Sequence, residues 1–148
     1  MKRIVIACDG SEAGREALEQ GLELARASGA VATLVHVRHA PLPIVGDPFY
    51  ERGLSRQLGH GRDVLDEARA LAADIGVAAE TELLEGDPAE RIVELARLRA
   101  ADLVVVGCRD RGPIAEALLG SVSRAILHRA DRPVLVARRR VRRDRRAA

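Results

Sequence analysis

Aromatic residues are nearly absent from this 148-residue chain, which contains one Phe, one Tyr and no Trp. Apolar residues still make up 47% of the sequence, so a sizeable core must be built from Val, Leu, Ile and Ala. The length fits one domain that needs no disulfide or metal to hold it together. This composition is typical of parallel strands covered by helices.

Cysteine and long apolar runs are scarce as well. Cys8 and Cys108 do not form the disulfide framework of a secreted domain. Each follows a strand-like run, so we expect small apolar residues at strand ends, with a redox pair as the alternative. No apolar run approaches the roughly 20 residues of a membrane span, and the first is too short for a signal peptide. We therefore expect a cytoplasmic protein.

The net charge of +2 hides an asymmetry between the body of the chain and its end. Residues 138–148 contain seven Arg and one Asp and carry +6, so residues 1–137 carry −4. We predict that this Arg-rich tail is disordered and solvated. The alternatives are docking onto nucleic acid, an anionic surface or a protein partner, or folding back on the acidic body. No aromatic residue in the tail could stack on bases, which disfavours nucleic acid.

Strand and helix patterns alternate along residues 1–137 and predict a single α/β domain. This alternation indicates an open parallel sheet with helices on both faces. Pro41, Pro43, Gly46 and Pro48 predict a loop at residues 39–50. Strands are expected at residues 3–8, 31–37, 79–84, 103–106 and 133–137, and helices at about 12–28, 51–75, 88–99 and 114–129.

The segment after the fourth predicted strand carries the strongest chemical signal. The apolar run stops at Gly107, a loop with Gly112 and Pro113 follows, and the cluster GSVS occupies residues 120–123. Backbone N–H groups and hydroxyls in such a segment can hold an anion, most commonly a phosphate. The local alternatives are a tight turn with positive φ at Gly107 and Ser caps at the start of a helix.

The chain as a whole resembles the small single-domain members of the universal stress protein family. The resemblance rests on IVIACDGSE, LVHV, EGDPAERIVELA, DLVVVG and LLGSVSRAILHRADRPVLV. It implies a five-stranded parallel sheet in the order 3-2-1-4-5. Ligands of such sheets bind at the carboxyl ends of the strands where the order reverses. Asp9 and Gly107 follow the two strands at that point.

The resemblance also implies that this edge binds ATP or a related adenine nucleotide, with or without Mg²⁺, as a regulatory ligand in a stress response. Asp9 would bond a ribose hydroxyl, with capping of the next helix as the alternative. Val37 would lie against the base, with core packing as its alternative. The residues assigned to the nucleotide are Asp9, Val37, Val106, Gly107, Arg109, Gly120, Ser121, Val122 and Ser123.

One position departs from the family's phosphate motif, G-x2-G-x9-G-[S/T]. Gly107, Gly120 and Ser121 match it, but Asp110 stands where the motif has its second glycine. A carboxylate there would repel a triphosphate by about 1 kcal/mol for each close charge pair in water. The flanking Arg109 and Arg111, or a divalent cation, could offset this repulsion. The alternative function is therefore a nucleotide-independent dimeric interaction protein.

No pattern in the sequence specifies an efficient enzyme. The P-loop and the G-x-G-x-x-G fingerprint are absent, and the four His residues lack zinc-ligand spacing. By family likeness, slow ATP hydrolysis or self-phosphorylation on Ser121 or Ser123 is the most that we expect.

The last predicted strand begins at Pro133 and ends at Ala137, and it would lie at the edge of the sheet. Folded proteins avoid unpaired apolar edges. The resemblance implies that this strand pairs with a second copy to form a homodimer, and the alternative is an edge covered by the tail.

Overall fold

The computed structural model describes residues 1–40, 48–108 and 119–138 as one alternating series of strands and helices. All strand pairings are parallel and the order is β3-β2-β1-β4-β5, which confirms the predicted sheet. Every strand boundary lies within one residue of its predicted position. The elements are β1 (Arg3–Ala7), α1 (Glu12–Ser28), β2 (Val31–Arg38), α2 (Pro48–Asp74), β3 (Ala79–Glu85), α3 (Pro88–Leu98), β4 (Leu103–Gly107), α4 (Ser121–Arg129) and β5 (Val134–Ala137).

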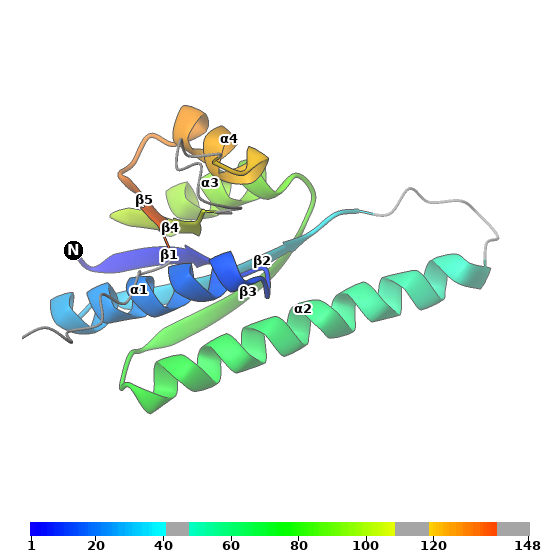
Figure 1. Ribbon diagram of the computed structural model, residues 1–148, viewed down its shortest axis with the longest axis horizontal. Helices are drawn as coiled ribbons and strands as arrows, with labels where there is room; N and C mark the ends of the chain where they lie inside the picture. Colours follow the sequence, from blue (N-terminus) through cyan, green and yellow to red (C-terminus); the bar gives the residue numbers. More distant parts are fainter. Residues whose placement is uncertain (41–47, 109–118, 139–148) are drawn as a thin grey trace, which may run out of the picture.

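Helices cover both faces of the sheet, with α1 and α2 on one side and α3 and α4 on the other (Figure 1). Because successive strand residues point to opposite faces, β1 sends Ile4 and Ile6 toward α1 and Val5 toward α3. All three side chains are fully buried. The two core layers are aliphatic, as the composition predicts. No helix in the described ranges is both long enough and apolar enough to cross a membrane.

Helix ends follow the expected chemistry at most positions. The Ser11 hydroxyl accepts a hydrogen bond from the N–H of Gly14, and Gly29 ends α1 with a φ of 68°. The predicted loop at residues 39–50 is wrong at its end, because α2 already begins at Pro48. In the described residues α4 begins at Ser121, since Gly120 has an extended ψ of 158°. The predicted helix start near residue 114 lies outside the described ranges.

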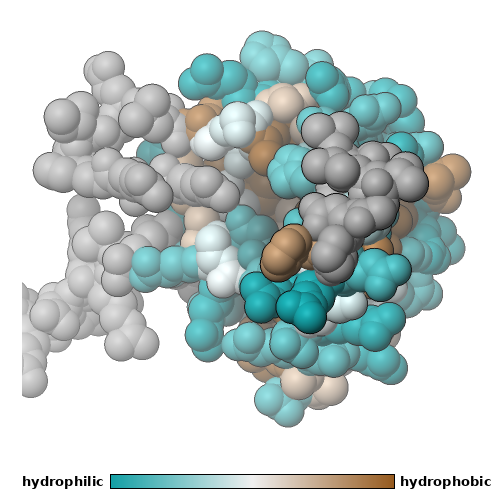
Figure 2. All heavy atoms as spheres, turned by 90° about the vertical axis from the view of Figure 1, so that its right-hand side faces the viewer, coloured by the Kyte–Doolittle hydropathy of each residue, from teal (hydrophilic) through white to brown (hydrophobic). Residues whose placement is uncertain are grey.

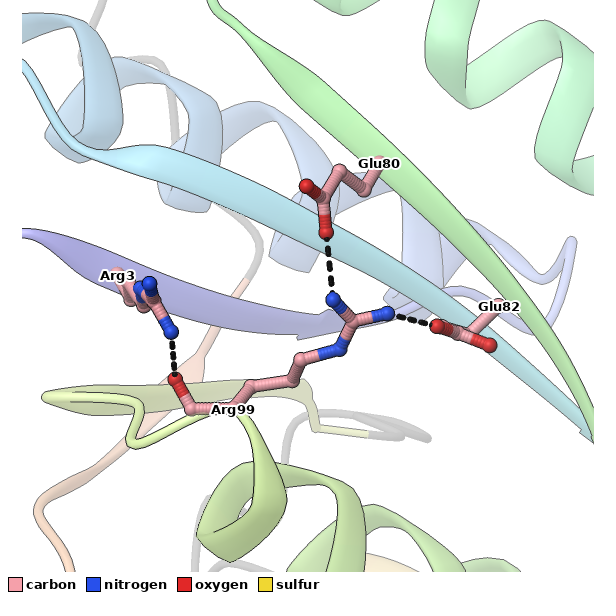
Figure 3. Close-up of polar contacts among 4 residues, drawn as sticks. All are labelled: Arg3, Glu80, Glu82 and Arg99. Atoms are coloured by element: carbon pink, nitrogen blue, oxygen red, sulfur yellow. Dashed lines mark hydrogen bonds and ion pairs between the residues drawn. The ribbon is translucent and has the colours of Figure 1, made fainter.

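The amino ends of the strands are held together by a polar network around Arg99 (Figure 3). Its guanidinium reaches Glu80, at 2.9 Å, and Glu82 on the edge strand β3. Arg3 of β1 donates a 2.9 Å hydrogen bond to the Arg99 carbonyl oxygen. Asp102 accepts hydrogen bonds from the first residues of the chain at this same end. These contacts hold α3 against the sheet and leave the carboxyl ends of the strands for other chemistry.

Candidate functional site

A cleft of about 370 Å³ opens at the carboxyl ends of the strands, where the order reverses between β1 and β4. This volume lies within the range of small-molecule sites. Figure 2 faces this end of the molecule, where hydrophilic residues predominate and smaller apolar areas lie between them. The lining residues are Ala7, Cys8, Asp9, Ala13, Gly14, Val35, Val37, His39, Pro88, Ile92, Val106, Gly107, Gly120, Ser121, Val122 and Ser123.

Every residue of the predicted nucleotide set that the structure describes lines this cleft. Arg109 and Asp110 lie outside the described residues. Sequence reasoning missed His39, Pro88 and Ile92. Their positions held a usable signal, since His39 directly follows β2 and only two residues separate α3 from β3. In a parallel sheet both places lie at the same carboxyl edge as β1 and β4.

Asp9 is held in place by the start of α1. Its Oδ1 accepts hydrogen bonds from the Ser11 N–H, at 2.9 Å, and from the Ser11 hydroxyl, at 2.5 Å. A Cβ atom at Gly14 would collide with this same Oδ1, so the first turn of α1 needs glycine there. The alternative role for Asp9, capping of α1, is wrong, because the Ser11 hydroxyl is the cap. The Asp9 carboxylate instead holds Ser11 and lines the cleft.

Gly107 serves close packing rather than a tight turn. The proposal of a positive φ is wrong, because the described glycines with positive φ are Gly10, Gly29, Gly76 and Gly86. A Cβ atom at position 107 would overlap the carbonyl group of Ala13 and approach the Gly14 nitrogen to 3.0 Å. Glycine thus lets the first turn of α1 rest directly on the end of β4.

The start of α4 offers backbone donors to the cleft. Gly120 is its N-cap residue and provides no side-chain hydrogen bond. The first N–H groups of a helix have no partner within the helix and carry its positive dipole end. Ser121 and Val122 are exposed, whereas Ser123 is 5% exposed and donates a 2.7 Å hydrogen bond to the Gly107 carbonyl oxygen.

The backbone of Val37 has one edge that none of the described strands covers. Pairing between β1 and β2 ends at Ala7 and Val35, and the Cys8 N–H bonds the Val35 carbonyl at 2.8 Å. Every second residue of a strand points its backbone groups to the same side. The N–H and carbonyl of Val37 therefore face the β1 side beyond the end of β1, at the cleft.

Cys8 lines the cleft, but its thiol has low reactivity. Burial above all, together with the charge of Asp9, raises the pKa of its thiol to about 12. The thiol therefore stays protonated, and a protonated thiol is a poor nucleophile. Cys8 and Cys108 are both free and buried, so they do not form a disulfide.

The described residues do not form a cage for a metal ion. Within the three described ranges, no three His, Cys, Asp or Glu side chains gather in a way that could hold one. The imidazole of His36, which is buried, bonds the Cys8 carbonyl oxygen at 2.7 Å. Mg²⁺ in nucleotide sites shares its coordination with phosphates, so any such ion here would depend on the ligand.

Fold and cleft together define an open α/β protein whose ligand site lies at the switch point of the sheet. Residues 1–138 match the model of the universal stress protein family. A universal stress protein of Thermus aquaticus is 39% identical over 139 residues, which cover 93% of this chain and 98% of the relative. The chain therefore belongs to the universal stress protein family, and the resemblance in its sequence is confirmed.

Solved structures of family members resemble this protein over most of its length. A family member from Burkholderia pseudomallei is 33% identical, with a TM-score of 0.75 and coverage of 91% of this chain and 94% of that one. A universal stress protein in complex with cAMP is 27% identical, with a TM-score of 0.72 and coverage of 92% and 96%.

Proposed function

We propose that the cleft binds an adenine nucleotide as a regulatory ligand, through which the protein takes part in a stress response. The observation that carries the proposal is that two backbone surfaces without a partner among the described residues lie in one cleft. The uncovered edge of Val37 lies at the end of β2, and the uncapped start of α4 follows β4. The first suits a base and the second suits a phosphate. The related protein solved with cAMP supports this choice of ligand.

The edge of Val37 favours adenine over guanine. Its N–H can donate to the N1 atom of adenine, and its carbonyl can accept from the 6-amino group. Guanine presents an N–H and a carbonyl at those two positions, so both contacts would become repulsive. Apolar side chains of Val35, Pro88 and Ile92 line the same cleft and can contact the ring.

Asp9 suits the ribose of the nucleotide, and the start of α4 suits its phosphate. The Asp9 carboxylate suits a ribose hydroxyl as a hydrogen-bond acceptor. The N–H and hydroxyl of Ser11 hold it just beyond the carboxyl end of β1. The N–H groups of Ser121, Val122 and Ser123 begin α4 and suit a phosphate.

Calorimetric titration of the full chain with AMP and GMP tests the proposal, after mass spectrometry of any nucleotide that copurifies. We expect saturable binding of AMP and no detectable binding of GMP. Asp9→Ala should weaken AMP binding more than Ser11→Ala, which removes the cap but keeps the carboxylate. Equal losses would mean that Asp9 acts only through the helix, and absence of AMP binding would contradict the proposal.

A nucleotide-independent interaction protein is the second candidate. It is favoured by one observation, namely that Asp9, Gly107 and Ser123 all have structural contacts that need no ligand. Under this alternative the cleft residues serve the fold alone. No adenine nucleotide would then bind at millimolar concentration, and the variants above would change stability only.

We also propose that β5 pairs with a second copy of the chain. β5 is an edge strand, and the carbonyls of Pro133 and Ala137 already bond β4. The backbone groups of Val136 therefore face outward. Val136→Pro should remove an outward N–H and convert a dimer to a monomer in light scattering, while Val136→Ala should not. A monomeric parent chain would contradict this assignment.

Three further expectations stay predictions from the sequence. They are the cytoplasmic location, the unknown protein partner and the separate Arg-rich tail, of which residues 139–148 lie outside the described ranges.

A further inference from the structure

We infer that the cleft is built for a nucleotide with a single phosphate group, so that ADP and ATP bind no more tightly than AMP. The inference rests on the proposed function and specifies its ligand class. Two independent observations carry it. The first is which helix N-termini around the cleft have side-chain caps, and the second is which charged side chains line the cleft.

Only one of the described helix starts at this edge is open to a phosphate. The first turn of α1 is capped by the Ser11 hydroxyl, which accepts from Gly14 at 3.1 Å. The first turn of α3 is capped by the Asp87 carboxylate, which accepts from the Glu90 N–H at 2.9 Å. Of the three described N-cap residues, those of α1, α3 and α4, Gly120 of α4 is the one without a side-chain cap. One helix start of this kind can neutralise part of the charge of one phosphate group.

The charge of the cleft disfavours additional phosphates. Asp9 is the one carboxylate in its described lining, and no Lys or Arg side chain lines it there. Each further phosphate would bring negative charge toward Asp9 without a compensating cation from the described residues.

Asp9 cannot readily turn away from this repulsion. Two hydrogen bonds from Ser11 hold its Oδ1, and the bare backbone of Gly14 lies directly beneath that oxygen. A fixed carboxylate beside the ribose position therefore suits a short, singly phosphorylated ligand. The second and third phosphates of ATP would have to remain in solvent, where they add little affinity.

Titration of the full chain with adenosine, AMP, ADP and ATP, each with and without Mg²⁺, tests the inference. AMP should bind about tenfold more tightly than adenosine, from one charge-assisted phosphate contact at a helix start. ADP and ATP should bind no more tightly than AMP in either condition. ATP binding tenfold tighter than AMP would overturn the inference and leave the proposed function standing. Absence of binding by all four ligands would contradict the proposed function itself.

A substitution at the helix start supplies a second readout. Gly120→Asp provides α4 with its own carboxylate cap, because the φ of −55° and ψ of 158° at this position suit an N-cap residue with a side chain. AMP affinity should fall to that of adenosine, while adenosine binding should stay unchanged. Gly120→Asn, an uncharged cap, is the matched control and should weaken AMP less. Unchanged AMP affinity in a folded Gly120→Asp protein would overturn the inference.

Discussion

The hydroxyl of Ser123 donates a 2.7 Å hydrogen bond to the carbonyl oxygen of Gly107 and so joins the last residue of the GSVS cluster to the first glycine of the phosphate motif. Gly107 ends β4, and Ser123 lies in the first turn of α4. The same motif that the sequence assigns to phosphate therefore also fixes α4 on the sheet. Ligand affinity and fold stability should respond together when this contact is removed.

Ser123→Ala removes the hydroxyl and leaves the Gly107 carbonyl oxygen without this donor. We expect the free energy of unfolding to fall by about 1 kcal/mol, the usual net value of one hydrogen bond. Urea denaturation measures the change. Ser121→Ala, at an exposed position in the same turn, is the matched control and should leave stability unchanged. Equal stability of the Ser123→Ala and parent proteins would show that the contact has no net value.

Gly107→Ala should destabilise the fold because its Cβ atom would overlap the backbone of Ala13. The first turn of α1 must then move, at a cost of roughly 1–3 kcal/mol. Thermal and chemical unfolding measure the cost. Gly59→Ala is the matched control, since a Cβ atom there meets nothing within 4 Å. In the interior of α2 that change should stabilise by about 0.5–1 kcal/mol. Destabilisation of the same size in both variants would contradict this packing account.

Asp102 should make stability depend on pH in the acid range. Its Oδ2 accepts hydrogen bonds from the backbone N–H groups of Lys2, at 2.6 Å, and Arg3, at 3.0 Å. These bonds lower the pKa of its carboxyl below the ordinary value of 3.8. The stabilising contribution is therefore present above that value and is lost as the pH falls through the folded-state pKa.

Denaturation curves of the parent and Asp102→Asn proteins from neutral pH down to pH values below 3.8 measure this dependence. The difference in stability between the two proteins should be constant at neutral pH and shrink on acidification. A difference that grows as the pH falls would contradict the assignment of sign.

Cys8 should resist thiol reagents in the folded protein. Burial raises the pKa of its thiol to about 12, so almost none is ionised near pH 8. Labelling with a chromogenic disulfide reagent should be slow in buffer and complete in denaturant. Rapid labelling of the native protein would show that this end of β1 is open to solvent.

Much of the fold follows from short-range patterns in the sequence. The capped start of α3 at Asp87 and the left-handed end of α1 at Gly29 were both predictable, because each depends on a few neighbouring residues. The start of α2 at Pro48 was not, because proline favours both loops and first helical turns. The sequence could likewise not decide between a turn and close packing at Gly107, since the collision partner, Ala13, is distant along the chain.

The candidate site was predictable to the extent that its residues follow strands. Gly107 is the last residue of β4, and Asp9 lies two residues after the end of β1. Pro88 and Ile92 were missed because their side chains look like ordinary helix residues until α3 is placed beside β2. The open edge of Val37 depends on β1 ending before β2, and such strand ends are the least predictable part of a sheet.

A crystal structure of the full chain with AMP is the most direct test of the central claim. The account predicts the adenine ring against the backbone of Val37, a ribose hydroxyl at Asp9, and the phosphate at the N–H groups that begin α4. An AMP molecule bound elsewhere, or an empty cleft at saturating AMP, would contradict it.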